Sequence, residues 1–138
     1  MSLQSKEISG GNPAWKILVV DDESAVSSLM KLLLERDGHS VQTVDNGIDA
    51  LFILQHKKFD LVTTDFSMTG MKGDTLATTI KELQPNLPVL MISSNGALAK
   101  ACGDPLPGVD MVIGKPFTVE DLRKAMAEVL HKGVSPRL

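Results

Sequence analysis

Cysteine and aromatic residues are scarce in this 138-residue sequence, which contains one cysteine, one tryptophan, four phenylalanines and no tyrosine. Because Cys102 is the only cysteine, no disulfide can form within the chain. Proteins without disulfides are typical of reducing compartments, so we expect a cytoplasmic protein.

Long hydrophobic runs and an excess of basic residues are also missing. The apolar runs are far shorter than the ~20 residues that a membrane-spanning helix needs, and the first twelve residues lack the apolar core of a signal peptide. Lysine and arginine number 14 against 17 acidic residues, which gives a net charge of −3. We therefore expect neither membrane insertion nor direct binding to nucleic acid.

Apolar residues follow two alternating patterns along the chain. Short continuous runs, typical of strands buried on both faces, are separated by stretches with apolar residues three or four positions apart, typical of amphipathic helices. The runs predict strands over 15–20, 40–44, 59–64, 88–93 and 109–113. The helical stretches are 24–37, 47–57, 73–84 and 118–131, with an uncertain short helix near 97–102 beside several prolines and glycines.

Strict alternation of strands and helices predicts an α/β domain with a mainly parallel sheet, right-handed crossovers and helices on both faces. No repeat, linker or low-complexity stretch divides residues 15–132, so we expect one domain there. We expect residues 1–14 to be a disordered lead, or one added for expression, and residues 133–138 to be a flexible tail.

Polar residues stand where four of the five predicted strands end. Asp21 and Asp22 follow the first strand, and Asp65 follows the third. Ser93 ends the fourth strand, and Lys115 comes just after the fifth. Open α/β sheets bind ligands in the crevice at the carboxyl ends of their strands, so these side chains are expected to line one pocket.

Three carboxylates at one edge repel one another unless a cation neutralises them. Lys115 supplies one positive charge, and Mg²⁺, which prefers oxygen ligands, is the economical completion. Such a site would bind a phosphoryl group between Mg²⁺ on one side and Lys115 with the Ser93 hydroxyl on the other. Asp65 would then be placed for in-line attack, and the product would be an aspartyl phosphate.

Four motifs, in this order, resemble those of response-regulator receiver domains, the CheY-like phosphoacceptors of two-component signalling. They are Ile17-Leu18-Val19-Val20-Asp21-Asp22-Glu23, residues 60–65 followed by 68–73, residues 88–93, and Lys115-Pro116-Phe117. The resemblance covers residues 15–132. It implies a flavodoxin-like (βα)5 doubly wound fold, with five parallel strands in the order 2-1-3-4-5 and a shortened or irregular fourth helix. Residues 83–89 resemble receivers attached to hybrid histidine kinases.

The resemblance implies a role for each polar residue in phosphoryl transfer. Asp65 would accept the phosphoryl group, Ser93 would be the switch hydroxyl, and the Lys115 side chain would pair with the phosphoryl group. The peptide bond between Lys115 and Pro116 would be cis. The donor would be a phosphohistidine on a histidine kinase or a histidine phosphotransfer protein. The chain would not be a classical enzyme, because it would catalyse only its own phosphorylation and slow dephosphorylation.

The resemblance also implies the ligands of Mg²⁺. Asp65 and Asp22 would hold the ion, Asp21 would act through water, and the backbone carbonyl of Ser67 would complete the set. The partner that receives the output signal is left open by the sequence.

Three features depart from the family pattern. Val112 lies three residues before Lys115, at a position where receivers often carry tyrosine or phenylalanine. Thr69 stands where many receivers have proline, and residues 103–108 form a stretch broken by glycine and proline. We therefore expect an output face that differs from the usual one.

Two other hypotheses remain open at this point. The chain could be a degenerate receiver that serves as a protein-interaction module without phosphorylation, which Val112 and the broken stretch at residues 103–108 favour. It could instead be a phosphohydrolase of the haloacid-dehalogenase type, although that family expects a second aspartate where this chain has Ser67.

Overall fold

The fold is built on a five-stranded parallel sheet, seen in a computed structural model that describes residues 14–94 and 106–134. The strands are β1 (Lys16–Val20), β2 (Ser40–Val44), β3 (Leu61–Asp65), β4 (Val89–Ser93) and β5 (Met111–Gly114). Their order across the sheet is β2-β1-β3-β4-β5, and every pair is parallel. The predicted strand order and flavodoxin-like class are therefore confirmed.

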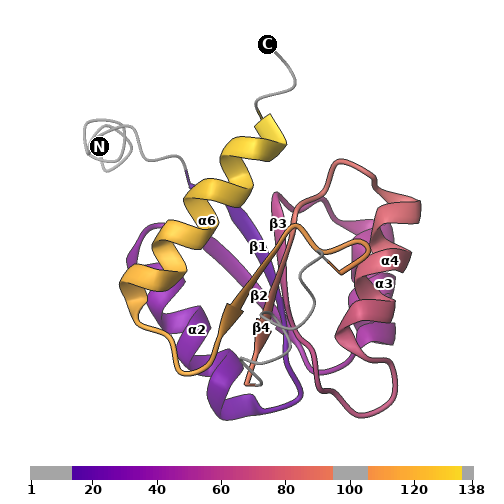
Figure 1. Cartoon of the computed structure of the whole chain (residues 1–138), viewed down its shortest axis with the longest axis horizontal. Helices are drawn as coiled ribbons and strands as arrows, with labels where there is room; N and C mark the ends of the chain where they lie inside the picture. Colours follow the sequence, from indigo (N-terminus) through magenta and orange to yellow (C-terminus); the bar gives the residue numbers. More distant parts are fainter. Residues whose placement is uncertain (1–13, 95–105, 135–138) are drawn as a thin grey trace.

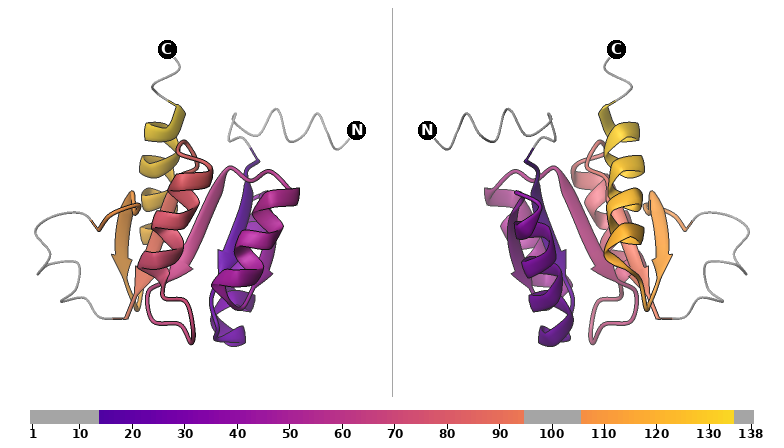
Figure 2. Two further views of the ribbon diagram at one scale, coloured as in Figure 1. Left: turned by 90° about the vertical axis from the view of Figure 1, so that its right-hand side faces the viewer. Right: turned by 90° about the vertical axis from the view of Figure 1, so that its left-hand side faces the viewer.

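Helices cover both faces of the sheet, so the molecule has three layers (Figure 1). The helices are α2 (Ser24–Arg36), α3 (Gly47–His56), α4 (Gly73–Leu83) and α6 (Val119–Val134). One apolar core joins α2 and α6 to the sheet, and a second core joins α3 and α4 to the opposite face. In Figure 2, β5 (orange) lies at one side of the sheet, and the indigo and violet strands lie toward the other side.

Alternate residues of each strand supply the two cores. Ile17 and Val19 of β1 belong to the core under α2 and α6, whereas Leu18 and Val20 belong to the core under α3 and α4. All four are essentially inaccessible to solvent. A strand buried on both faces needs continuous apolar residues, which explains the runs in the sequence.

The ends of the helices are fixed by local hydrogen bonds. At the start of α6, Thr118 and Asp121 cap each other: each backbone N–H donates to the other's side-chain oxygen at 3.0 Å. At the start of α3, the Asn46 side chain accepts the Asp49 N–H at 2.8 Å. After α2, Gly38 adopts a positive φ of 97°, a conformation that glycine adopts readily.

Two strands, β3 and β5, begin two residues later than the apolar runs predicted, whereas β1 and β4 begin one residue later. Before β3, the Asp60 carboxylate accepts the Lys16 N–H at 2.8 Å, so the regular strand starts only at Leu61. Before β5, the Val109 N–H closes a turn onto the carbonyl of Leu106. The uncertain helix near 97–102, and with it the predicted shortening of the fourth helix, lies outside the described residues.

Candidate phosphoacceptor site

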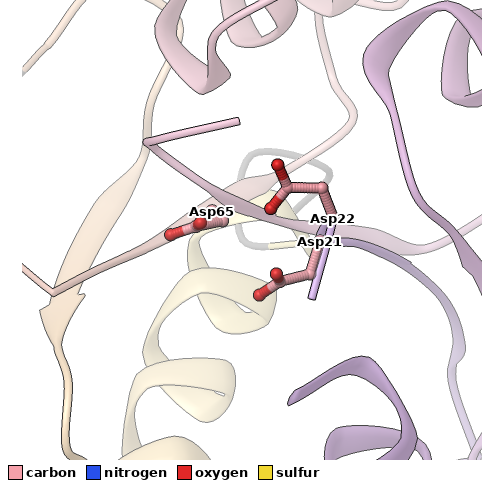
Figure 3. A group of neighbouring side chains, drawn as sticks. All are labelled: Asp21, Asp22 and Asp65. Atoms are coloured by element: carbon pink, nitrogen blue, oxygen red, sulfur yellow. The ribbon is translucent and has the colours of Figure 1, made fainter. Parts of the chain in front are cut away.

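The three aspartates predicted to meet do so at the carboxyl edge of the sheet. Asp21 and Asp22 directly follow β1, and Asp65 is the last residue of the neighbouring β3. One carboxylate oxygen of each lies within 4.8 Å of those of the other two. Figure 3 shows the Asp21 and Asp22 carboxylates on the side that faces Asp65.

Burial differs among the three carboxylates. Asp21 and Asp65 are 3% and 6% exposed, while Asp22 is exposed at the rim. Backbone hydrogen bonds fix Asp21, because its N–H donates to the Val44 carbonyl and the Glu23 N–H donates to Asp21 Oδ1 at 2.9 Å. The site therefore has a rigid buried floor and one carboxylate that solvent can reach.

Lys115 brings the positive charge predicted for this cluster. Its Nζ lies 3.4 Å from Asp65 Oδ1, 3.5 Å from Asp21 Oδ2 and 3.8 Å from Glu23 Oε1. Its backbone N–H donates to the Ser93 carbonyl at 2.8 Å, which holds the segment after β5 against the end of β4. The Lys115–Pro116 peptide bond is cis, as the resemblance implies.

Desolvation sets the acidity of Asp65. Burial raises the pKa of this carboxyl group above its ordinary value, and the nearby Asp21 charge acts in the same direction. The Lys115 ammonium lowers the pKa in opposition, and burial prevails. A carboxylate held in this way is poorly solvated, which favours its reaction with an electrophile or its contact with a cation.

Ser93 and Ser67 lie at the end of β4 and in the loop after β3. Ser93 ends β4 beside Asp65 and is only 2% exposed. Ser67 is exposed in the loop after β3. Gly73 closes that loop: its N–H donates to the Phe66 carbonyl at 3.0 Å, and a Cβ there would lie 3.0 Å from the Phe66 Cα.

Thr69 is a contact residue that the motif analysis did not identify as part of the site. Its backbone N–H lies 3.0 Å from Asp22 Oδ2, and its hydroxyl lies 3.4 Å from the same oxygen. The available signal was the replacement of a common proline, which cannot donate a backbone hydrogen bond, by a residue with two donors. Glu23 was also missed, since its place in the first motif gives no hint of its approach to Lys115.

Val112 is the second residue of β5 and pairs with Met91 of β4. It is half-buried and packs against the core formed with α3 and α4. At the position where receivers often carry an aromatic ring, this chain therefore has a small residue that packs against the core.

Comparison with known proteins identifies the family. The chain matches the family described as "Response regulator receiver domain" over residues 17–127. It is 36% identical to the chemotaxis protein CheY-3 of Vibrio cholerae over 124 residues, which are 88% of this chain and 95% of that protein. The chain belongs to the response-regulator receiver family.

Longer relatives match the chain as well. The chain is 32% identical over 116 residues to the transcriptional regulatory protein GlrR of Escherichia coli, covering 84% of this chain and 26% of that one. It thus spans about a quarter of the length of this relative.

Solved structures agree with the fold. NtrX from Brucella abortus superposes with a TM-score of 0.83 at 31% identity, over 91% of this chain and 29% of that one. A receiver domain protein from Clostridium thermocellum gives a TM-score of 0.78 at 32% identity, over 87% and 96% of the two chains. Within the described part of the chain, no helix has the length and apolar character needed to cross a membrane.

Proposed function

We propose that this chain is an active phosphoacceptor, in which Asp65 takes a phosphoryl group from a phosphohistidine of a histidine kinase or histidine phosphotransfer protein. The observation that carries the proposal is the position of Asp65, buried at the strand end beside two further aspartates and 3.4 Å from Lys115. Membership in the receiver family supports the same function.

The donor set fits Mg²⁺. Three carboxylates lie within 4.8 Å of one another, all their donors are hard oxygens, and one carboxylate is open to solvent. Asp65, Asp22 and the Ser67 carbonyl would hold the ion, with Asp21 acting through water. When bound, Mg²⁺ would neutralise charge on the phosphoryl oxygens.

Asp65, Lys115 and Ser93 have separate roles in the phosphoryl transfer. An Asp65 carboxylate oxygen attacks phosphorus in line, the bond from phosphorus to the histidine nitrogen breaks, and the imidazole leaves with the electron pair. Lys115, within reach of both Asp21 and Asp65, pairs with the incoming phosphoryl oxygens. The Ser93 hydroxyl donates a hydrogen bond to the same group and thereby signals phosphorylation to β4.

The wider assignments follow from these roles. We propose that residues 15–132 form the receiver domain, with the segments on either side outside it, and that the chain works in the cytoplasm, where histidine kinases present their phosphohistidines. Dephosphorylation of Asp65 is slow, because Ser67 offers no carboxylate or amide that could orient a water for attack.

A direct phosphorylation assay tests this function. The purified chain is incubated with acetyl phosphate or phosphoramidate, with and without Mg²⁺, and its mass is measured. We expect a Mg²⁺-dependent gain of one phosphoryl group that Asp65→Asn abolishes. Asp45→Asn is the matched control, because Asp45 follows β2 at the same sheet edge but stands outside the cluster.

The opposite result would select the degenerate receiver. If the folded chain binds Mg²⁺ and still gains no phosphoryl group, it acts as an interaction module, and Val112 becomes the first position to study. The phosphohydrolase hypothesis has lost its basis, because the chain belongs to the receiver family and carries Ser67 where that chemistry needs an aspartate.

A further inference from the structure

A cleft with lysines in its walls lies at the edge of the sheet formed by β2. It has a volume of about 550 Å³ and is lined by residues 40–43 of β2 together with Lys16, Lys31, Lys57 and Lys58. Four consecutive residues of one strand line it, so the cleft follows the strand rather than meeting it at a point. It shares no residue with the acidic cluster.

The outer side of β2 offers backbone groups for pairing. Ser40 donates its N–H to the Trp15 carbonyl, and the Val44 carbonyl accepts the Asp21 N–H, so both of these residues turn their backbone groups toward β1. Because backbone direction alternates along a strand, the groups of Val41 and Thr43 point away from the sheet. Among the described residues, β2 pairs with β1 alone.

Existing contacts cover this edge weakly. Lys31 Nζ reaches the Val41 carbonyl at 3.4 Å, which is a long hydrogen bond, and lies 3.4 Å from the exposed Glu35 carboxylate. Lys57 Nζ donates to the uncharged Gln42 side chain at 3.0 Å. A ligand could replace the contacts of Lys31 and Lys57 without leaving a buried charge unpaired, because both lysines are partly or fully accessible to solvent.

The charge of the cleft is positive and incompletely balanced. Four lysines line it, and two acids contact lining residues: the Glu35 carboxylate pairs with Lys31, and the Asp60 carboxylate accepts the Lys16 backbone N–H. No residue in the described part of the chain forms an ion pair or hydrogen bond with the Lys58 ammonium. Since the whole chain carries a net charge of −3, this positive cleft is a local feature.

We propose that the β2 edge binds an extended acidic segment of a partner protein as an added strand. Its backbone would pair with the N–H and C=O groups of Val41 and Thr43, and its carboxylates would contact the surrounding lysines. The strand-shaped cleft favours an extended peptide over a compact anion, because a compact anion would leave the backbone groups of β2 unused. This binding is independent of phosphorylation at Asp65.

A defined peptide tests the proposal. The probe is an octapeptide of alternating glutamate and threonine, acetylated and amidated, titrated into the full chain and followed by amide NMR. We expect the Val41 and Thr43 amides to shift and to exchange their hydrogens more slowly when the peptide is bound. N-methylation of one alternate set of peptide residues should abolish binding, while methylation of the other set should not.

Charge variants complete the experiment. Lys57→Glu with Lys58→Glu should weaken binding roughly tenfold, the scale expected for reversing two exposed charges. Lys124→Glu, an exposed lysine on α6, should leave the affinity unchanged, and Asp65→Asn should bind as the parent does. If Lys57 and Lys58 variants lose the native spectrum, Lys16→Gln replaces them, with a smaller loss expected.

Three outcomes would overturn the proposal. A glutamine–threonine octapeptide that binds as tightly as the acidic one would exclude the lysines as its basis. Inorganic pyrophosphate that competes with the peptide and gives the same shifts would make the cleft a small-anion site. Absence of binding, with Val41 and Thr43 exchange unchanged, would mean that the lysines only protect an open edge from aggregation.

Discussion

The Thr69 backbone N–H donates to Asp22 Oδ2 at 3.0 Å and ties the loop after β3 to the end of β1. The two residues are 47 positions apart in the sequence. This bond occupies one oxygen of the exposed Asp22 carboxylate and restricts the orientation of the carboxylate group. Partners of metal-ligating groups that fix orientation in this way commonly change metal affinity.

Thr69→Pro should therefore weaken Mg²⁺ binding. Proline removes both the backbone donor and the hydroxyl, so we expect an affinity about tenfold lower, at the small end of the effects of such supporting partners. Titration calorimetry with Mg²⁺ measures it. Thr69→Ser retains both donors and should match the parent, whereas equal affinities of Thr69→Pro and Thr69→Ser would show that the bond does not position Asp22.

Lys115→Met should strengthen Mg²⁺ binding while impairing phosphorylation. Removing the ammonium beside Asp21 and Asp65 makes the net charge of the site more negative. Coulomb energies of about 1 kcal/mol at this range predict roughly fivefold tighter Mg²⁺ binding. The melting temperature without Mg²⁺ should fall, and its gain on adding Mg²⁺ should grow. An unchanged Mg²⁺ affinity would mean that Lys115 does not compete with a cation for these carboxylates.

The fold was predictable because its main signals are local. Continuous apolar runs such as Ile17–Val20 are required by burial on two faces, and the alternation with amphipathic stretches leaves few topologies. Strand starts were less predictable. Phe59 suggested an earlier start for the third strand, but the Asp60 carboxylate accepts the Lys16 N–H, a contact between residues distant in the sequence.

The site was predictable where residue type and strand end coincide. Asp21, Asp22 and Asp65 meet because parallel strands share an edge, which needs no knowledge of side-chain conformation. The contact of Thr69 depends on the path of a loop, and that of Glu23 depends on a side-chain rotamer. The replacement of a common proline marks Thr69 as unusual but does not identify Asp22 as its partner, and nothing in the sequence marks Glu23. The hydrogen bond from the Trp15 N–H to the His39 side chain was also not predicted, because it depends on a side-chain conformation.

His39 should make the stability of the chain sensitive to mild acid. Its Nδ1 accepts the Trp15 N–H at 3.1 Å, and burial lowers its pKa despite the opposing charge of Asp37. Because its pKa is lower in the folded chain than in the unfolded chain, protonation favours unfolding. Stability should be fully present above the ordinary histidine pKa of about 6.5 and decline as the pH falls through and below it.

His39→Asn tests that dependence. Asparagine can accept the Trp15 N–H through its side-chain oxygen but does not titrate, so urea midpoints measured on either side of the ordinary histidine pKa should differ less than in the parent. Similar midpoints of variant and parent at the higher pH would show that the hydrogen bond is retained. If the variant keeps the parent's full loss in acid, His39 is not its source.

Gly108→Ala should lower the free energy of unfolding by about 2–4 kcal/mol, since it combines backbone strain with a steric clash. Gly108 has a φ of 81°, and a Cβ there would lie 2.7 Å from the Ala77 carbonyl carbon and 2.8 Å from the Thr78 nitrogen. The clash would force the turn before β5 away from α4. Gly38→Ala is the matched control, because Gly38 also has a positive φ, of 97°, but a Cβ there meets nothing within 4 Å.

Urea unfolding should show a loss of only about 1 kcal/mol in the free energy of unfolding for Gly38→Ala, the cost of the backbone conformation alone. Equal losses in the two variants would mean that the turn moves freely, and that the close approach of Gly108 to α4 does not fix the position of β5.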